Sequence, residues 1–221
     1  RSRSDDQVAI RVDLVEFTPP LTEFLGRAAY VQLMLFENLS RALSTAPSTA
    51  AKAAIGPAVE LAISKHRALA DEITRAGGSI ATAMDPYTAE VDLFERSTQG
   101  ADWYETLMTC YLTAGFLDDL FARLGAGLPA ESSARIVAIY HSGTAEPMLG
   151  QQLQSAIEAN PRLASRLAMW GRRLVGDTLL LARASLTWGE NHRSDEERAE
   201  PVFTELIAAH TRRMDRLGLT A

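Results

Sequence analysis

Apolar residues recur at helical spacing along most of the chain, and this periodicity restricts the fold more than any other feature. After Pro20, for example, Gly26, Tyr30, Leu33 and Met34 fall on one face of a helix. No segment beyond residue 20 shows the strict alternation of apolar and polar residues that a half-buried strand needs. The sequence therefore predicts an all-α protein built from long amphipathic helices that pack face to face.

Capping and helix-breaking residues divide the chain into segments. We expect long helices over residues 22–44, 47–76, 102–125, 129–160 and 161–188, a short helix over 85–98, and a last helix that Ser194 caps. Short connections favour antiparallel neighbours, which indicates a four-helix bundle with accessory C-terminal helices. The predicted division is a disordered or extended arm over 1–20, the bundle over 21–188, and a C-terminal loop and helix over 189–221 that pack on the bundle or extend it.

Composition indicates the compartment of the protein and the classes of partner that it can bind. Its 221 residues carry a net charge of −6, and an acidic surface repels phosphates, which argues against nucleic acid as a partner. No apolar run approaches the roughly 20 residues that a membrane-spanning helix requires, and no secretory signal is visible, so we expect a cytoplasmic protein. The single cysteine, Cys110, lies in an apolar run and is predicted to be an inert, packed thiol.

Four side chains that can bind a metal ion follow apolar residues at spacings of three and four. They are Glu37, His66, Asp119 and His141. This spacing predicts that all four face the bundle interior, where ionisable groups are costly unless they are paired or bind a metal. Two carboxylates and two imidazoles that converge would suit a single iron, manganese or zinc ion.

Three interpretations of these four residues stay open. They can form a metal-free polar cluster joined by hydrogen bonds between carboxylates and imidazoles. They can hold one metal ion, or they can belong to a two-metal site in which Glu60 or Asp118 supplies a missing carboxylate. Asp118 is rotated by about 100° from Asp119 around the helix axis, so both cannot point at one centre.

The predicted fourth helix contains two residues that weaken helices, close to His141. Gly143 and Pro147 lie in it, and a proline inside a helix removes a backbone hydrogen bond and kinks the chain. Two interpretations stay open: the kink deforms or opens the candidate site, or the helix tolerates the kink without any effect on the site. Further along, the charged run from His210 to Arg216 is interpreted as a solvated helix face rather than as an RNA contact.

Six short motifs support a more specific comparison. They are Phe36-Glu37, the second helix centred on His66, Asp102-Trp103, Gly115 to Asp119, Thr144-Ala145-Glu146, and the distinctive run from Trp170 to Gly176. With these motifs, residues 23 to about 185 resemble an actinobacterial ferritin-like family related to the tRNA hydroxylases that act on isopentenyl-adenosine. The resemblance implies a ferritin-like bundle and a non-haem di-iron centre that activates dioxygen.

The same resemblance assigns ligand positions on all four helices. They fall on Glu37, on Ile63 with His66, on Asp119, and on His141 with Thr144. Where the family has a carboxylate, this chain has Ile63 and His141, and where the family has a histidine it has Thr144. Isoleucine and threonine cannot replace these ligands, so a relative that kept the fold around a degenerate metal site is the more economical interpretation.

The sequence leads to one functional expectation and two alternatives. We expect a non-catalytic ferritin-like protein with a binding or assembly role, and no residue is assigned a catalytic part. The alternatives are a metal-dependent oxidoreductase or hydroxylase that uses the four candidate ligands around one ion, and a small-ligand binder that uses the interior cavity. The expected cofactor is none, or a single iron, manganese or zinc ion. The expected partner is a second copy in a homodimer, and the resemblance keeps tRNA open.

Overall fold

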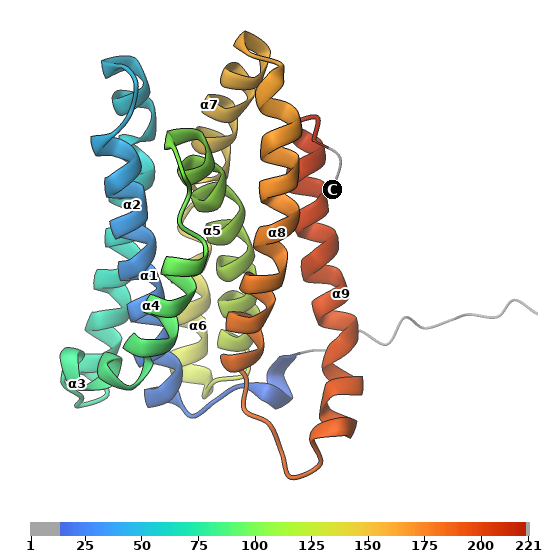
Figure 1. The fold of residues 1–221 in the computed structure, drawn as a ribbon. Helices are drawn as coiled ribbons and strands as arrows, with labels where there is room; N and C mark the ends of the chain where they lie inside the picture. The colour runs from blue at the N-terminus through green and yellow to red at the C-terminus, as the bar shows by residue number, and fades with distance from the viewer. Residues whose placement is uncertain (1–13, 220–221) are drawn as a thin grey trace, which may run out of the picture.

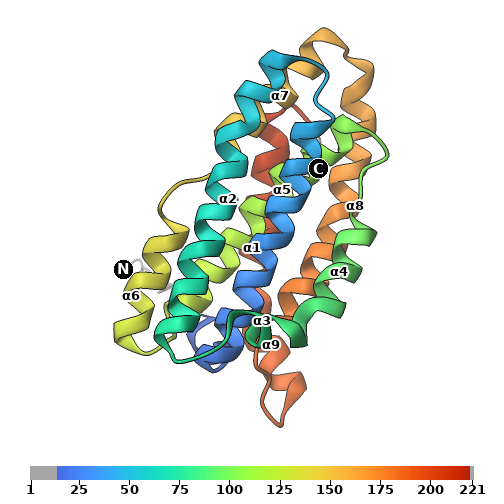
Figure 2. The ribbon, with the colours of Figure 1, turned by 90° about the vertical axis from the view of Figure 1, so that its left-hand side faces the viewer.

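The computed structural model describes residues 14–219, and all regular structure within that range is helical (Figures 1 and 2). The elements in chain order are η1 (Leu14–Phe17), α1 (Leu21–Ser44), α2 (Thr49–Arg75), α3 (Ile80–Met84), η2 (Asp85–Tyr87), α4 (Thr88–Ser97), α5 (Trp103–Gly125), α6 (Ala130–Tyr140), α7 (Glu146–Ala159), α8 (Arg162–Ala184) and α9 (His192–Arg216). The predicted all-α class is confirmed. None of the described helices is long and apolar enough to cross a membrane.

Helix α5 lies at the centre of the molecule because it is apolar on nearly every face. Its residues from Leu107 to Leu117 are all buried, as expected for a helix that other helices surround. It contacts α1, α6, α7, α8 and α9, and α1 packs along α2. Helices α1, α2 and α5 take three positions of the bundle, and α6 followed by α7 takes the fourth (Figures 1 and 2).

The predicted N-cap at Asp102 is confirmed, the predicted cap at Ser194 is wrong, and the second helix begins at Thr49 after a cap at Ser48 instead of at residue 47. Ser48 accepts a hydrogen bond from the backbone N–H of Ala51, and Asp102 accepts one from Glu105, so both side chains satisfy N–H groups at a helix start. The last helix, by contrast, is capped by Asn191 and not by Ser194. Helix α9 therefore begins with His192, before Ser194.

The predicted fourth helix is not continuous. Its first part, α6, ends with Tyr140, and its second part, α7, begins with Glu146. Pro147 stands in the first turn of α7, where its missing N–H leaves no helical hydrogen bond unmade. The helix predicted over 129–160 is thus interrupted around Gly143, and the weakness that the sequence indicated is a full break.

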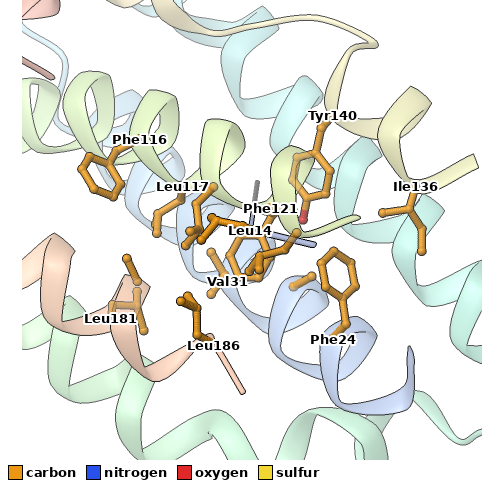
Figure 3. Packing of buried hydrophobic residues seen from close by; sticks show 14 of the residues in the cluster. Leu14, Phe24, Val31, Phe116, Leu117, Phe121, Ile136, Tyr140, Leu181 and Leu186 are labelled. Atoms are coloured by element: carbon orange, nitrogen blue, oxygen red, sulfur yellow. The ribbon is translucent and has the colours of Figure 1, made fainter. Parts of the chain in front are cut away.

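Two clusters of buried apolar side chains form the core. On α2 they meet at Lys65, since Ala62 belongs to one cluster and Leu69 to the other. In the cluster shown in Figure 3, the ring of Phe121 stacks on that of Tyr140, with centroids 6.0 Å apart and an angle of 12°. Each fully buried aromatic or aliphatic side chain contributes about 1.5–3 kcal/mol to folding, so this core positions every helix around α5.

The N-terminal arm is only partly within the described residues. The extended conformation predicted for it is wrong at its end, where Leu14–Phe17 form η1 and both Leu14 and Phe17 are buried in the core. The backbone carbonyl of Phe17 accepts a hydrogen bond from the N–H of Thr187, 2.9 Å away. Residues 1–13 of the predicted arm lie outside the described residues.

Helix α9 packs against α5 and α8 at two glycines. A Cβ atom at Gly115 would lie 2.3 Å from Nε of Arg213, and one at Gly171 would lie 2.8 Å from Cε of Met214. The buried ring of His210 donates from Nε2 to the carbonyl of Gly171, 3.0 Å away, and burial lowers the pKa of His210 below its ordinary value. The two glycines therefore bring a charged and an apolar side chain of α9 close to the bundle.

Replacing Gly115 tests this close approach. We expect Gly115→Ala to lower the free energy of unfolding by about 1–3 kcal/mol, because the added methyl group must displace the guanidinium of Arg213. The control is Gly176→Ala on α8, where nothing lies within 4 Å of the new Cβ. That variant should be neutral or more stable by up to about 1 kcal/mol. Chemical denaturation measures both, and equal effects would contradict the packing argument.

Glu72 fixes α6 against α2. Both oxygens of its buried carboxylate accept hydrogen bonds from Arg135 of α6, at 2.8 and 2.9 Å. These bonds hold the pKa of Glu72 below its ordinary value, with burial acting in the opposite direction. A carboxyl group with a lowered pKa in the folded state stabilises the fold above its unfolded pKa and loses that effect as the pH falls through the folded value.

Accordingly, Glu72→Gln should lower the midpoint of thermal unfolding at pH 7, and its difference from the unchanged protein should narrow as the pH is lowered below 4.5. Glu60→Gln, an exposed change on the same helix, is the matched control and should have little effect at any pH. Melting curves across the acid range measure this. A difference that stays constant with pH would show that the ionised carboxylate of Glu72 does not hold α6.

Candidate functional site

The four predicted metal ligands are not brought together. Glu37 and His141 are exposed, so the prediction that all four face the interior is wrong for these two. His66 is half-buried and its Nδ1 donates to the backbone carbonyl of Ala29, 2.8 Å away, while Asp119 pairs with Arg213. Among the side chains that the structure describes, no three of histidine, cysteine, aspartate or glutamate are grouped so that they could hold a metal ion.

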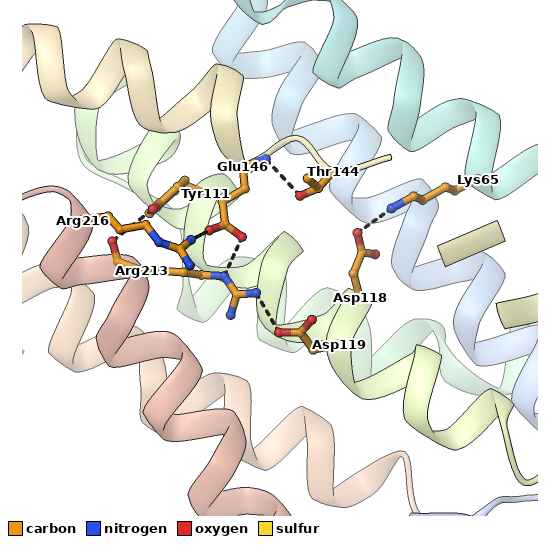
Figure 4. A network of polar contacts seen from close by, with 8 residues as sticks. All are labelled: Lys65, Tyr111, Asp118, Asp119, Thr144, Glu146, Arg213 and Arg216. Atoms are coloured by element: carbon orange, nitrogen blue, oxygen red, sulfur yellow. Dashed lines mark hydrogen bonds and ion pairs between the residues drawn. The ribbon is translucent and has the colours of Figure 1, made fainter. Parts of the chain in front are cut away.

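A different polar cluster occupies the space between α1, α2 and α5. Nζ of Lys65 lies 2.6 Å from Oδ2 of Asp118, and the amide of Gln32 donates to Oδ1 of Asp118 at 2.9 Å. Lys65 is only 3% exposed and Gln32 only 1%. Figure 4 shows Asp118 turned toward Lys65, away from Asp119, its neighbour in the sequence. Three helices of the bundle are therefore joined through one carboxylate, and we call Gln32, Lys65 and Asp118 the central cluster.

Each residue of the central cluster lies on the apolar stripe that its helix buries. On α2, Lys65 stands three residues after Ala62 and four before Leu69, both buried. On α1, Gln32 stands four residues after Ala28 and three before Leu35, which are also buried. The same spacing could have identified these residues from the sequence, because a polar side chain on such a stripe must face the core.

Burial and neighbouring charges shift the pKa of Asp118 and that of the nearby Tyr140. Burial raises the pKa of the Asp118 carboxyl, although the neighbouring Lys65 and the Gln32 amide act in the opposite direction. Burial, together with the charge of Asp118, also raises the pKa of Tyr140 well above its ordinary value. The Gln32 amide next to the hydroxyl of Tyr140 acts in the opposite direction on that pKa.

A second ion-paired group lies on the other side of Asp119. Arg213 of α9 donates from Nη2 to Asp119 at 2.7 Å and from Nε to Glu146 at 3.0 Å, and Arg216 pairs with the other oxygen of Glu146 (Figure 4). Burial opposes the charge of Arg213, but its hydrogen bonds to the two carboxylates outweigh this and raise its pKa. The solvated face predicted for residues 210–216 is wrong for His210, Arg213 and Met214, which are buried.

The break between α6 and α7 opens a cavity of about 360 Å³ beside both groups. Its lining residues come from α5, from the break and α6 and α7 beside it, and from α9: Gly115, Asp118, Asp119, Ala122, Tyr140, His141, Gly143, Thr144, Glu146 and Arg213. Two buried polar atoms on its lining residues have no partner among the described residues, namely Oη of Tyr140 and Nη1 of Arg213. Polar atoms in such a position are normally hydrogen-bonded in native proteins. We call this space the break cavity.

Comparison with known protein families identifies the family of this chain. Residues 16–187 match the model of a ferritin-like domain of actinomycetes, which covers most of the chain. The chain therefore belongs to this ferritin-like family, and the predicted ferritin-like bundle is confirmed. Helix α9 follows the matched segment. No curated protein matches the sequence.

The interior does not fit the di-iron centre that the resemblance to the hydroxylases implied. Such a centre needs a carboxylate from each of two helices and a Glu-x-x-His motif from each of the other two. In the central cluster, the groups that could bind a metal ion are one carboxylate and one amide. The carboxylate already pairs with Lys65, whose ammonium group has three N–H donors and no lone pair to offer a metal ion. His141 and Thr144, at the ligand positions of the fourth helix, are exposed at the break.

The central ion pair can be tested by removing its cation. Lys65→Met leaves a largely buried carboxylate without its partner, so we expect a loss of about 3–5 kcal/mol in the free energy of unfolding at pH 7. The loss should shrink as the pH is lowered, because a protonated Asp118 carries no charge. Adding Asp118→Asn should recover most of it at pH 7. Denaturation curves of the single and double variants measure this, and simple additivity of the two changes would rule out the coupling.

Proposed function

We propose that this protein is a ferritin-like protein that acts without di-iron chemistry and binds a small molecule in the break cavity. The observation that carries the proposal is the cavity of about 360 Å³ at the break, whose lining includes the polar side chains of Asp119 on α5, Glu146 on α7 and Arg213 on α9. Convergent polar groups of this kind fix the orientation of a small molecule in a binding site.

The size and position of the cavity support this role. Its volume of about 360 Å³ falls at the lower end of the range of roughly 300–1,000 Å³ that small-molecule sites occupy. A second cavity of about 520 Å³ shares Thr144 and Glu146 with it. The two spaces are neighbours at the start of α7, and the larger one continues along α7 to Gln154.

The central cluster supports a role without metal. An ion pair between Lys65 and Asp118 puts a positive charge next to a carboxylate in the middle of the bundle, and a cation in that place disfavours a metal ion beside Asp118. In this proposal the metal site is degenerate, and the link to tRNA hydroxylases is one of sequence motifs and descent, not of shared chemistry. The protein is a binding protein and no residue is assigned a catalytic role.

A cavity-filling variant tests the proposal. Ala122→Leu adds a side chain to the wall of the break cavity without touching its ion pairs, and Ala138→Leu adds the same side chain to an exposed position on α6. In a thermal-shift screen against small polar metabolites, at least one compound should raise the melting temperature of the unchanged protein and of Ala138→Leu, but not of Ala122→Leu. A screen without any such compound would refute the proposed function.

The same screen should include Fe²⁺, Mn²⁺ and Zn²⁺, because a one-metal site is the main alternative. Binding of one ion per chain, measured by metal analysis and abolished by His66→Ala or Asp119→Ala, would favour the metal-dependent alternative instead. We expect no ion to bind with that dependence, since Nδ1 of His66 already bonds to Ala29 and Asp119 already pairs with Arg213.

A further inference from the structure

The three most exposed large apolar side chains among the described residues lie on two neighbouring helices. They are Leu93 of α4 and Met169 and Leu180 of α8, which are 59%, 61% and 68% exposed. Helix α4 packs beside α8 (Figures 1 and 2). Met169 and Leu180 point within about 20° of each other around the helix axis, because they stand three turns apart. Exposed apolar side chains that gather in this way mark an interaction surface. We call this side of α8, with Leu93 beside it, the α8 face.

The α8 face has a groove at one end and a protruding side chain at the other. The groove, of about 140 Å³, lies between α4 and α8, and its apolar lining is Leu93, Phe94, Leu180 and Leu181. Met169 does not line the groove and stands about 16 Å from Leu180 along the helix axis. A groove of this volume has room for one apolar side chain, and methionine suits irregular spaces because it is unbranched and flexible.

Charges of opposite sign accompany the two ends. Arg173, which is exposed, follows Met169 by one turn of the helix. At the groove, the carboxylate of Asp177 is part of the lining, and it makes no ion pair with any residue that the structure describes. The α8 face therefore carries a cation beside its protruding side chain and an anion beside its groove.

A two-fold axis would bring these complementary features of two copies together. In a symmetric dimer the same surface of both subunits meets, so each contact occurs twice. When two α8 helices run antiparallel about an axis near residues 174 and 175, Met169 of each copy lies opposite Leu180 and the groove of the other. The same register puts Arg173 of each copy beside Asp177 of the other. One arrangement thus satisfies the apolar and the charged groups.

We propose that two copies of this protein form a symmetric dimer through the α8 face, with Met169 of each copy in the groove of the other. The dimer is independent of the ligand-binding function, because neither cavity at the helix break is lined by α4 or α8. A second copy fits this face better than a membrane does, since each end of the face complements the other in shape and charge. Helix α8 is about 35 Å long, so a contact along it and α4 can reach the roughly 800 Å² per partner that stable interfaces bury.

The oligomeric state tests the dimer. Sedimentation velocity of the full chain over a range of concentrations should show a species of twice the 24.1 kDa of one chain. Met169→Glu and Leu180→Glu each place a carboxylate in the apolar contact, so each should weaken the dimer at least about tenfold. The matched control is Ile207→Glu, the same change at an exposed apolar position of α9, and it should leave the dimer unchanged. Circular dichroism should show equal helix content in all four proteins, because the three positions are exposed.

Exchanging the charges gives a result that only a contact between two copies explains. Arg173→Glu alone, or Asp177→Arg alone, brings like charges together in a homodimer, so each variant should be largely monomeric. When the two variants are mixed, each substituted side chain meets an opposite charge on the other chain, and a mixed dimer should form. Arg173→Glu also loses its contact with the ring of Trp170, but mixing cannot restore that contact. Native mass spectrometry identifies the mixed dimer, and its recovery should shrink with added salt.

The contrary outcomes are equally distinct. A protein that stays monomeric at all concentrations would overturn the proposal, as would a dimer that neither glutamate change on α8 weakens. Charge variants that are monomeric and do not combine on mixing would overturn the register and the proposal with it. Sedimentation with vesicles of phosphatidylcholine and phosphatidylglycerol tests the other apolar occupant. Vesicle binding by a monomer, lost in Met169→Glu, would assign the α8 face to a membrane and refute the dimer.

Discussion

The buried ion pair between Lys65 and Asp118 is the interaction on which the interior depends. It places a charged side chain that is only 3% exposed at the junction of the two core clusters, where α2 passes from one to the other. A buried pair need not stabilise a fold more than apolar residues of the same volume would, but breaking one is strongly unfavourable. Asp118 can therefore meet Lys65 and Gln32 only when α1, α2 and α5 turn these particular faces toward one another.

The break in the fourth helix and the position of α9 follow from a few local features. Gly143 and Pro147 interrupt the helix and leave space beside Asp118 and Asp119. Gly115 lacks a side chain, so the guanidinium of Arg213 fits against α5 and meets Asp119 and Glu146. A bundle of the ferritin-like family thus acquires a polar cavity closed on one side by a helix that follows the segment matched to the family.

The helices could be predicted from the sequence because caps and periodicity are local. The observed α1 and α5 begin and end within about a residue of their predicted bounds. The candidate ligands were predicted less well, because apolar residues at spacings of three and four precede them without placing them at the centre of the buried face. His66 follows Lys65 by one position and Asp119 follows Asp118 by one position. One position turns a side chain by about 100° around the helix axis. Glu37 lies five positions after Gln32 and is exposed.

Other parts of the site depend on contacts between distant segments, which the local pattern does not contain. The run from His210 to Arg216 has the composition of a solvated face, and only the glycine at position 115 and the carboxylates of Asp119 and Glu146 bring Arg213 into the interior. The sequence indicated a weak point near Pro147, but whether the helix bends or breaks there depends on how α6 and α7 pack on α2 and α5.

Anomalous diffraction from crystals soaked in Mn²⁺ tests the central claim most directly. The claim is that an ion pair between Lys65 and Asp118, without metal, joins the helices in the interior. The expected map has no anomalous peak between α1, α2 and α5, and has density for Lys65 within hydrogen-bond distance of Asp118. An anomalous peak beside Asp118, with the Lys65 side chain turned away, would contradict this account.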